Sequence, residues 1–434
     1  MLYQARASVY GRVVARRIPR ALCAAVVLAL GLLALAAPVA TAQSTCVFDE
    51  PTGVLQVTLV SSAPAVIMRE TDAITLDAAP CGTATVTGTE TILVTGTGQG
   101  QPDDLTLDLS GGPFAPGLSA ETDGGDPEIE IDVALPGGGT LTIAGGPSDD
   151  VVTLGEAGAN LNAGEAVGDA DVTLSGGEFV IAGHEGSDTL SVAGGDGTGG
   201  PAPAATVEGG AGDDTVAGAA GGSSLDAGEG VDTMDYSAAT DVSADLSSGI
   251  GQPVTGGTAD TLTGFENLVG SAGNDRLVGD DGPNLLAGGL GDDSLEGLGG
   301  DDVLNGGQGQ DVLDLSLADQ SVEVDLAEGT ATGQGTDTLD GIESVIGSEN
   351  GDTLRGSADD NVLRGGKGAD EVRGNAGRDW IGGGRGNDLL FGGADGDTLD
   401  GGKGKDQLDG GEGKDICIPG PDPDSWTGCE RVRL

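Results

Sequence analysis

Acidic residues recur at a fixed interval near the C-terminus of this 434-residue chain. From residue 347 to 418, Asp or Asn occupies every ninth position, with glycines before it and an apolar residue two places after it. Glycines allow tight turns in which main-chain carbonyl oxygens converge, and the carboxylates add charged oxygens to the same turns. A hard divalent cation such as Ca²⁺ takes about six to eight oxygens. The spacing therefore suggests cation binding by stacked turns.

The nine-residue unit fills three uninterrupted blocks, at 209–235, 270–314 and 347–418. The blocks hold three, five and eight units, and all sixteen units have an apolar residue at the eighth place. Thirteen units have Asp at the sixth place, and the exceptions are Ser223, Asn284 and Asn361. A solvated acidic edge that only discourages aggregation is the alternative interpretation. It would need acids but no constant phase, so we favour cation binding.

Each unit is expected to form one glycine turn and one short strand around its apolar residue. Such a strand cannot bury its side chain alone, but strands stacked about 4.8 Å apart bury a continuous file of side chains. The sequence therefore predicts an all-β fold, a parallel β-roll or β-helix solenoid built on glycine-rich units. The 84 glycines and the formal charge of −53 could also indicate disorder. Scattered glycines would not keep a period, so we favour the solenoid.

The pattern resembles the nonapeptide of repeats-in-toxin (RTX, hemolysin-type) calcium-binding proteins. The resemblance implies a right-handed parallel β-roll with two units per coil, and multiple calcium ions between stacked turns, held by main-chain carbonyls and the sixth-place side chains. In the last block, the implied ligands form one file of Asp352, Asp370, Asp388 and Asp406 and another of Asn361, Asp379, Asp397 and Asp415. In the earlier blocks they are Asp275, Asp293 and Asp311, then Asn284 and Asp302, then Asp214 and Asp232. The Ala, Gly and Arg bias is similar to that of secreted calcium-binding proteins of actinobacteria-like organisms.

Calcium is also expected to control folding of the blocks. Stacked carboxylates about 5 Å apart repel each other by roughly 3 kcal/mol per neighbouring pair at an effective dielectric constant near 20. A divalent cation between them removes this repulsion and binds only to the assembled turns. We therefore expect the blocks to fold when calcium is present.

The N-terminus predicts export from the cytoplasm. Five Arg precede the apolar run that starts at Ala21, and Ala40–Ala42 offers a small-residue cleavage site before Gln43. These features are typical of a secretory signal peptide over 1–42, with a retained membrane anchor as the alternative. No long apolar run follows residue 42, so we expect no membrane span after the signal is removed.

The cysteines agree with an oxidising compartment. Once Cys23 is removed with the signal, the even set Cys46, Cys81, Cys417 and Cys429 remains. Sequence proximity favours a 46–81 pair and a 417–429 pair, although four cysteines allow three connectivities. We expect these disulfides to close the two ends of the mature chain, with the second pinning a C-terminal cap.

The remaining segments are also expected to be rich in strands. Two spacers between the blocks resemble each other, as in the match of Thr258–Ser271 with Gly335–Ser348, and plain linkers are the alternative. Residues 43–205 have alternating apolar and polar runs, for which we prefer a degenerate β-helix to a sandwich, with Ser110–Glu128 as a projecting loop. The expected organisation is a signal peptide (1–42), an irregular β-rich N-terminal region (43–205), a first repeat block (206–235), a spacer (236–269), a second block (270–314), a second spacer (315–346), a third block (347–418) and a cap (419–434).

Charge and residue types narrow the function. Only Arg69 and Arg276 are basic between 43 and 346, so the chain should repel nucleic acids. His184 is the only histidine, which leaves no histidine pair for a zinc protease site. We expect a secreted protein, released or held at the cell surface, that binds calcium and has a structural or binding role, with a cell-wall or extracellular glycan as candidate partner. The alternatives are a polysaccharide-modifying enzyme or an adhesin whose site lies in 43–205.

Overall fold

The computed structural model describes residues 43–433 apart from 61–63, 88, 90, 98–101, 112–129, 137, 156–157, 162–171, 195–201, 203, 219–221 and 254–257. Within these residues all regular structure is β-strand, and no helix long and apolar enough to cross a membrane occurs among them. The expected signal peptide and nearly all of the expected loop at Ser110–Glu128 lie outside the described residues.

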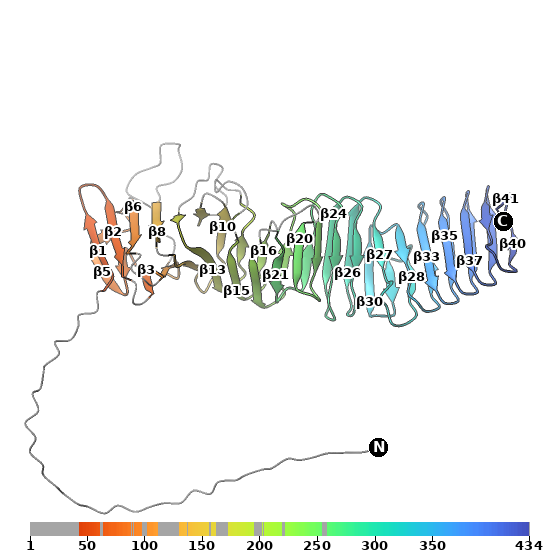
Figure 1. Ribbon diagram of the computed structural model, residues 1–434, viewed down its shortest axis with the longest axis horizontal. Helices are drawn as coiled ribbons and strands as arrows, with labels where there is room; N and C mark the ends of the chain where they lie inside the picture. The colour runs from red at the N-terminus through yellow and green to blue at the C-terminus, as the bar shows by residue number, and fades with distance from the viewer. Residues whose placement is uncertain are drawn as a thin grey trace, which may run out of the picture. The chain divides into compact units, whose positions relative to one another are not determined.

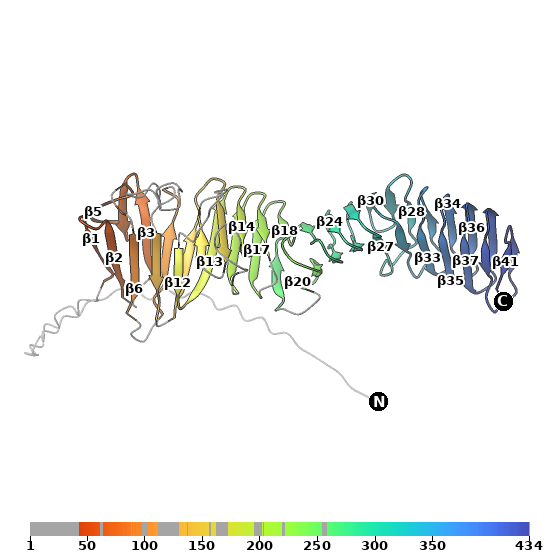
Figure 2. The same cartoon turned by 90° about the horizontal axis from the view of Figure 1, so that it is seen from above.

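The strands form two sheets, here called the first and the second sheet, and the chain alternates between them (Figures 1 and 2). In the last block each coil gives one strand to each sheet. The first sheet contains β32 (Thr353–Arg355), β34 (Glu371–Asn375), β36 (Leu389–Ala394), β38 (Gln407–Glu412) and β40 (Ser425–Thr427). The second sheet contains β31 (Ser344–Ile346), β33 (Val362–Lys367), β35 (Trp380–Arg385), β37 (Thr398–Lys403), β39 (Ile416–Ile418) and β41 (Arg431–Val432).

Neighbouring strands in the repeat blocks are parallel and in constant register. Val372 of β34 pairs with Leu390 of β36, and Ile381 of β35 pairs with Leu399 of β37. Two nine-residue units therefore make one coil, and each residue lies beside its equivalent one coil later. The predicted all-β parallel solenoid is confirmed.

The earlier blocks are built in the same way. In the first sheet they contain β16 (Thr215–Ala217), β18 (Thr233–Asp235), β22 (Asn267–Val269), β24 (Leu285–Leu290) and β26 (Val303–Gln308). In the second sheet they contain β15 (Thr206–Ala211), β17 (Ser224–Glu229), β23 (Arg276–Val278), β25 (Ser294–Glu296) and β27 (Val312–Asp314).

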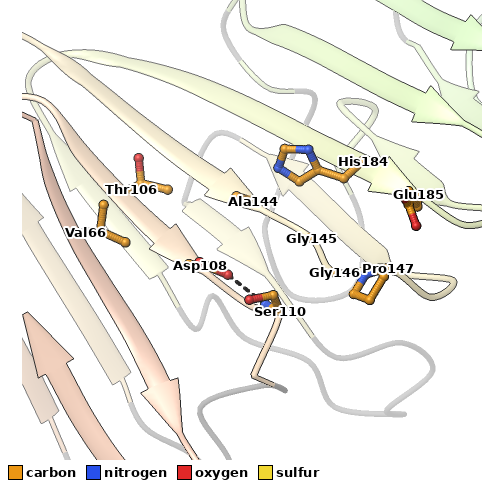
Figure 3. Close-up of a pocket in the computed structure, with 10 residues that line it drawn as sticks. All are labelled: Val66, Thr106, Asp108, Ser110, Ala144, Gly145, Gly146, Pro147, His184 and Glu185. Carbon is orange, nitrogen blue, oxygen red and sulfur yellow. Dashed lines mark hydrogen bonds between the residues drawn. The ribbon is translucent and has the colours of Figure 1, made fainter. Parts of the chain in front are cut away.

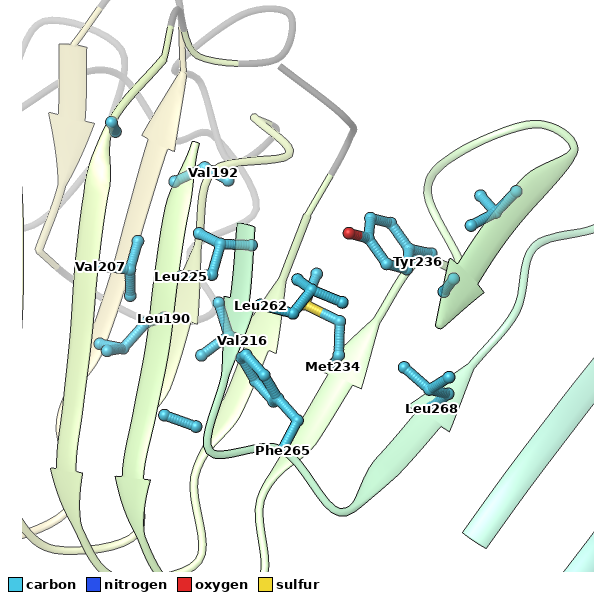
Figure 4. Packing of buried hydrophobic residues seen from close by; sticks show 14 of the residues in the cluster. Leu190, Val192, Val207, Val216, Leu225, Met234, Tyr236, Leu262, Phe265 and Leu268 are labelled. Atoms are coloured by element: carbon cyan, nitrogen blue, oxygen red, sulfur yellow. The ribbon is translucent and has the colours of Figure 1, made fainter. Parts of the chain in front are cut away.

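A file of apolar side chains fills the space between the sheets. The eighth-place residues of all sixteen units are buried, from Val216 at 0 % exposed to Cys417 at 0 %, and Leu408 is 2 % exposed. Around the first block, larger side chains such as Met234, Tyr236 and Phe265 join this core (Figure 4). One apolar residue per unit is thus sufficient to form a hydrophobic core, because every strand contributes its side chain to the same interior.

The two spacers form antiparallel three-stranded insertions on opposite sheets. The first, β19 (Val242–Asp245), β20 (Ile250–Pro253) and β21 (Asp260–Thr263), belongs to the second sheet. The other, β28 (Glu323–Asp325), β29 (Thr330–Thr332) and β30 (Thr336–Asp340), belongs to the first sheet. Each insertion pairs in parallel with the coil that follows it, through β23 and β32 respectively.

The N-terminal region continues the same two sheets. Its parallel series β2–β6–β8–β12 and β3–β7–β9–β13 are stacked as in a β-helix, and β13 pairs directly with β15 of the first block. First-sheet strands are β1 (Thr45–Asp49), β2 (Val54–Leu59), β6 (Thr91–Gly96), β8 (Glu130–Ala134), β10 (Val151–Gly155), β11 (Gly158–Asn160), β12 (Val172–Ser175) and β14 (Thr189–Ser191). Second-sheet strands are β3 (Ala65–Glu70), β4 (Ala73–Leu76), β5 (Ala79–Thr85), β7 (Leu105–Asp108), β9 (Thr140–Ala144) and β13 (Glu178–Glu185).

One disulfide lies near each end of the described chain. Cys46 of β1 is bonded to Cys81 of β5, and Cys417 of β39 is bonded to Cys429. Both bonds have the pairing that sequence proximity favours. The second bond ties the C-terminal segment to a side chain of the core file.

Candidate functional site

Two files of acidic residues follow the sheets, one beside each. Asp370 and Asp388 come immediately before β34 and β36 of the first sheet, and Asp379 and Asp397 come before β35 and β37 of the second. All four are buried, and Asp388 is 0 % exposed. Stacking of coils brings together the residues that are eighteen positions apart, as the repeat predicts.

One carboxylate oxygen of each residue joins neighbouring coils. The main-chain N–H of Asp388 donates to Oδ1 of Asp406 at 3.0 Å, and the N–H of Asp379 donates to Oδ1 of Asp397 at 2.9 Å. The same bond connects Asp214 to Asp232 in the first block and Asp293 to Asp311 in the second. The sixth-place side chain therefore holds the turn of the preceding coil in place.

The other carboxylate oxygen is buried without a hydrogen-bond partner in most of these turns. Oδ2 of Asp388 is such an atom, and it lies close to Gly383. A Cβ atom built on Gly383 would lie 2.5 Å from this oxygen and 2.9 Å from the carbonyl oxygen of Gly401, one coil later. At Gly401 the equivalent point is 2.7 Å from Asp406 Oδ2 and 2.7 Å from the carbonyl oxygen of Pro419. A charged oxygen and a carbonyl oxygen thus converge where only glycine leaves room.

The glycines of the turn are required by backbone conformation and by close packing. Gly384 and Gly386 have φ of 99° and 150°. A Cβ on either one would collide with the carbonyl oxygen of its equivalent in the preceding coil, Gly366 or Gly368. Only glycine combines this conformation with this approach, so the spacing of glycines fixes the shape of the turn.

Burial raises the pKa of these carboxyl groups. Removal from water is the largest cause, and it raises the pKa of Asp370 and Asp397 to about 7 and that of Asp379 to about 6. Carboxylates of the adjacent coils add to the rise at Asp370, whereas the N–H donated by Asp352 opposes it. The ionised turns are therefore unfavourable at neutral pH unless positive charge is supplied.

These turns fit a hard divalent cation that takes much of its coordination from the main chain. Nowhere in the described residues do three Asp, Glu, His or Cys side chains gather into a metal-binding group. The carbonyl oxygens that converge with the carboxylates, such as those of Gly401 and Pro419, are suitable further ligands. Calcium accepts such mixed oxygen ligands at flexible geometry, whereas magnesium demands a more regular octahedron.

A family model for the RTX calcium-binding nonapeptide repeat, with four copies, matches residues 208–242, 260–282, 278–313, 346–381 and 382–417. The chain therefore contains several RTX calcium-binding repeats between residues 208 and 417. RTX repeats bind multiple calcium ions, so calcium is the cation for which the turns are built. A comparison with curated proteins finds no match.

Four of the predicted RTX ligands have a different environment. Oδ2 of Asp275 accepts the N–H of Ser271 at 2.5 Å, and Oδ2 of Asp352 accepts the N–H of Ser348 at 2.6 Å. The side-chain oxygens of the two asparagines are bonded in the same way, Asn284 by the N–H of Asp280 and Asn361 by the N–H of Ser357. In these turns the chain itself satisfies the oxygen that is unpartnered elsewhere.

Several further residues belong to the same files although they were not among the predicted ligands. Glu266, Glu343 and Glu430 replace Asp, and each accepts the N–H of the preceding file member through Oε2 at 2.7 to 2.9 Å. Asp150, Asp188, Asp337 and Asp424 also belong to the files. All seven lie outside the three uninterrupted blocks. A usable signal was an acid just before a short strand, as in the Phe265–Val269 segment.

His184 lies near the C-terminal end of β13, in the turn that leads to the file member Asp188. It lines a hollow of about 510 Å³ together with Asp108, Ser110 and Glu185 (Figure 3). Its φ is 81°, so it takes the left-handed conformation that glycine has at the equivalent place of most RTX turns. His184 therefore provides the left-handed backbone conformation that this turn requires.

Some basic residues of the last block lie on the outer faces of the sheets. Arg364 lies over the ring of Trp380 at 5.3 Å from its centroid, and Arg373 lies over Phe391 at 4.1 Å. Arg378 lies in the turn between β34 and β35 and forms an ion pair with Asp360. Basic side chains of the last block therefore occur both over the strands and in the turns.

Proposed function

We propose that this protein is a secreted calcium-binding solenoid with a structural or binding role outside the cell, and that calcium completes the folding of its RTX blocks. The buried, unpartnered Oδ2 atoms carry the proposal, because burying a charged oxygen without a partner is costly and a cation offsets that cost. The turns would hold calcium through sixth-place carboxylates and glycine carbonyls. Bound calcium would neutralise the negative charge of the stacked carboxylates.

If the chain is exported, calcium sites of low affinity are sufficient for its folding. Extracellular modules bind calcium at roughly 10⁻⁴–10⁻³ M, which suffices outside the cell, where calcium is plentiful, and leaves the sites empty inside. The two disulfides suit the same oxidising compartment. We infer that folding is coupled to export, with the chain released or held at the cell surface.

Calcium removal from the mature chain, residues 43–434, tests this proposal. The only two tryptophans, Trp380 and Trp426, lie in β35 and β40, so their fluorescence reports on the last block and on the cap that follows it. In chelator we expect red-shifted emission and loss of far-UV circular dichroism typical of strands, and calcium near 10⁻³ M should restore both. Magnesium at the same concentration is the control and should restore less. Unchanged spectra in chelator would show that folding does not depend on calcium.

A glycan-binding surface in the N-terminal region is a second candidate function. The hollow beside His184 favours it, because it is open and has carboxyl, hydroxyl and imidazole groups at its edge. Binding of the mature chain to cell-wall polymers, compared with an Asp108→Ala variant, tests it. A polysaccharide-modifying enzyme predicts in addition that His184→Ala abolishes turnover of a glycan. Equal binding by both chains counts against this surface.

A further inference from the structure

The turns of the two files fall into two classes according to one main-chain angle. The residue four positions before each file member either has a left-handed φ or does not. At Gly289 φ is 109° and Oδ2 of Asp293 has no partner, whereas Ser271, one coil earlier, is not left-handed and donates its N–H to Oδ2 of Asp275. We call the first kind an open turn and the second a closed turn.

The rule holds for every file turn with Asp or Asn that the structure describes at both positions, apart from that of Asp337. Gly333, four residues before Asp337, has φ of 131°, but Oδ2 of Asp337 is not one of the buried oxygens without a partner. Thirteen turns are open, and their members are Asp188, Asp214, Asp232, Asp293, Asp302, Asp311, Asp370, Asp379, Asp388, Asp397, Asp406, Asp415 and Asp424. Five turns are closed, and their members are Asp150, Asp275, Asn284, Asp352 and Asn361.

The angle matters more than the residue type. Leu298 and Asn375, with φ of 67° and 77°, make open turns although neither is glycine. Gly146 makes a closed turn, with its N–H 2.6 Å from Oδ2 of Asp150. The class of a turn is therefore a property of its backbone.

A closed turn is unsuited to a cation for a simple electrostatic reason. Its amide hydrogen points at the carboxylate oxygen and places partial positive charge where a cation would have to bind. At Asp352 the Ser348 hydroxyl adds a bond to Oδ1 at 2.8 Å. An open turn leaves the same oxygen charged, buried and unpartnered.

We propose that calcium is held by the open turns only, and that the closed turns are cation-free parts of the same files. This inference rests on the proposed function. It removes Asp275, Asn284, Asp352 and Asn361 from the expected ligands. It adds Asp188, which is 1 % exposed, precedes the first RTX match and shares the space above Gly183 with the carbonyl oxygen of Gly209. His184 supplies the left-handed residue of that site.

Matched Asp→Asn variants of the mature chain test the two classes. Asp275→Asn and Asp352→Asn change closed turns, and Asp293→Asn and Asp370→Asn change the open turns one coil later in the same files. Asn is suitable because Asn284 and Asn361 already occupy closed turns. Bound calcium per chain is measured by equilibrium dialysis and atomic emission at fixed free calcium, with circular dichroism as a check of folding.

We expect the closed-turn variants to bind as much calcium as the unchanged chain. Each open-turn variant, and Asp188→Asn, should lose roughly one ion or more, because an amide is a weaker ligand than a carboxylate. Loss of calcium in Asp275→Asn or Asp352→Asn would overturn the inference even if an open-turn variant failed to fold. Equal calcium in all five variants would also overturn it. An unchanged chain that binds no calcium would instead refute the proposed function.

Discussion

Oδ1 of Asp388 accepts the main-chain N–H of Asp370, one coil earlier, at 3.0 Å. Both residues are buried, and the bond repeats along each file wherever an acid occupies the sixth place. Each carboxylate of an open turn therefore acts on two neighbours, since one oxygen holds the preceding turn and the other faces the following turn.

Asp388→Ala should destabilise the last block. It removes the acceptor for a buried N–H, which costs about 1–3 kcal/mol, and it also removes a charged oxygen from an open turn. Urea unfolding followed by tryptophan emission, in saturating calcium, measures the change. The exposed Glu412→Ala is the control and should change stability by less than about 0.5 kcal/mol. Equal effects of the two variants would contradict the role given to Asp388.

Leu390→Ala should be among the most harmful apolar changes. Leu390 is 0 % exposed in the core file, and truncation of a buried leucine costs about 2–5 kcal/mol. The adjacent Leu389 is partly exposed on the outer face of the same strand, so Leu389→Ala should cost much less. The same denaturation experiment compares the two variants. A larger effect at Leu389 would contradict the assignment of Leu390 to the buried face of β36.

The calcium-free chain should become more stable as the pH falls. Burial raises the pKa of Asp302, Asp370 and Asp397 from 3.8 to about 7. A raised pKa in the folded state means that the folded chain binds protons more tightly, so its contribution to stability is complete below about pH 4 and is lost as the pH rises through 7. Calcium binds the ionised groups and should reverse this trend. Urea midpoints between pH 4 and pH 8, with chelator and with calcium, give both slopes, and parallel slopes would exclude a shared site for protons and calcium.

Removal of the C-terminal disulfide should loosen the last coil selectively. Cys417→Ala with Cys429→Ala deletes a crosslink between residues 12 apart in sequence, worth about 2–4 kcal/mol in typical proteins. Trp426 lies between these cysteines, so its emission should shift at lower urea. The matched variant, Cys46→Ala with Cys81→Ala, acts on β1 and β5 and should leave the tryptophan signal unchanged. A shift with that variant instead would mean that the two ends unfold together.

The sequence predicted the repeat architecture well because it is periodic. One apolar residue and one acid per nine positions fixed the core file and the two acidic files, as Leu390 and Asp388 illustrate. Glu266, Glu343 and Glu430 were not predicted as file members, because each is one methylene longer than Asp and lies where the nine-residue period is interrupted. Asp150 and Asp188 were not assigned to a file because inserted segments separate them by 38 residues, although the main-chain N–H of Asp150 donates to Oδ1 of Asp188.

Whether a turn is open or closed was harder to predict from the sequence. Ser271 and Ser348 offered a signal, because serine rarely adopts a left-handed φ. Gly146 and Leu298 show why that signal is incomplete, since glycine makes a closed turn at one place and leucine an open turn at another. The angle depends on the packing of the neighbouring coil, which a local motif does not encode.

The two spacer insertions resemble each other in sequence, yet β19–β21 belongs to the second sheet and β28–β30 to the first. Between β22 and the second insertion lie five repeat strands, β23 to β27. Because five is odd, the second insertion follows the first by a whole number of coils plus one half, and it lies on the opposite side. Whether the number of units in the second block is odd or even thus determines the sheet to which the second insertion belongs. A homologue with four or six units in this block would have both insertions on the same side.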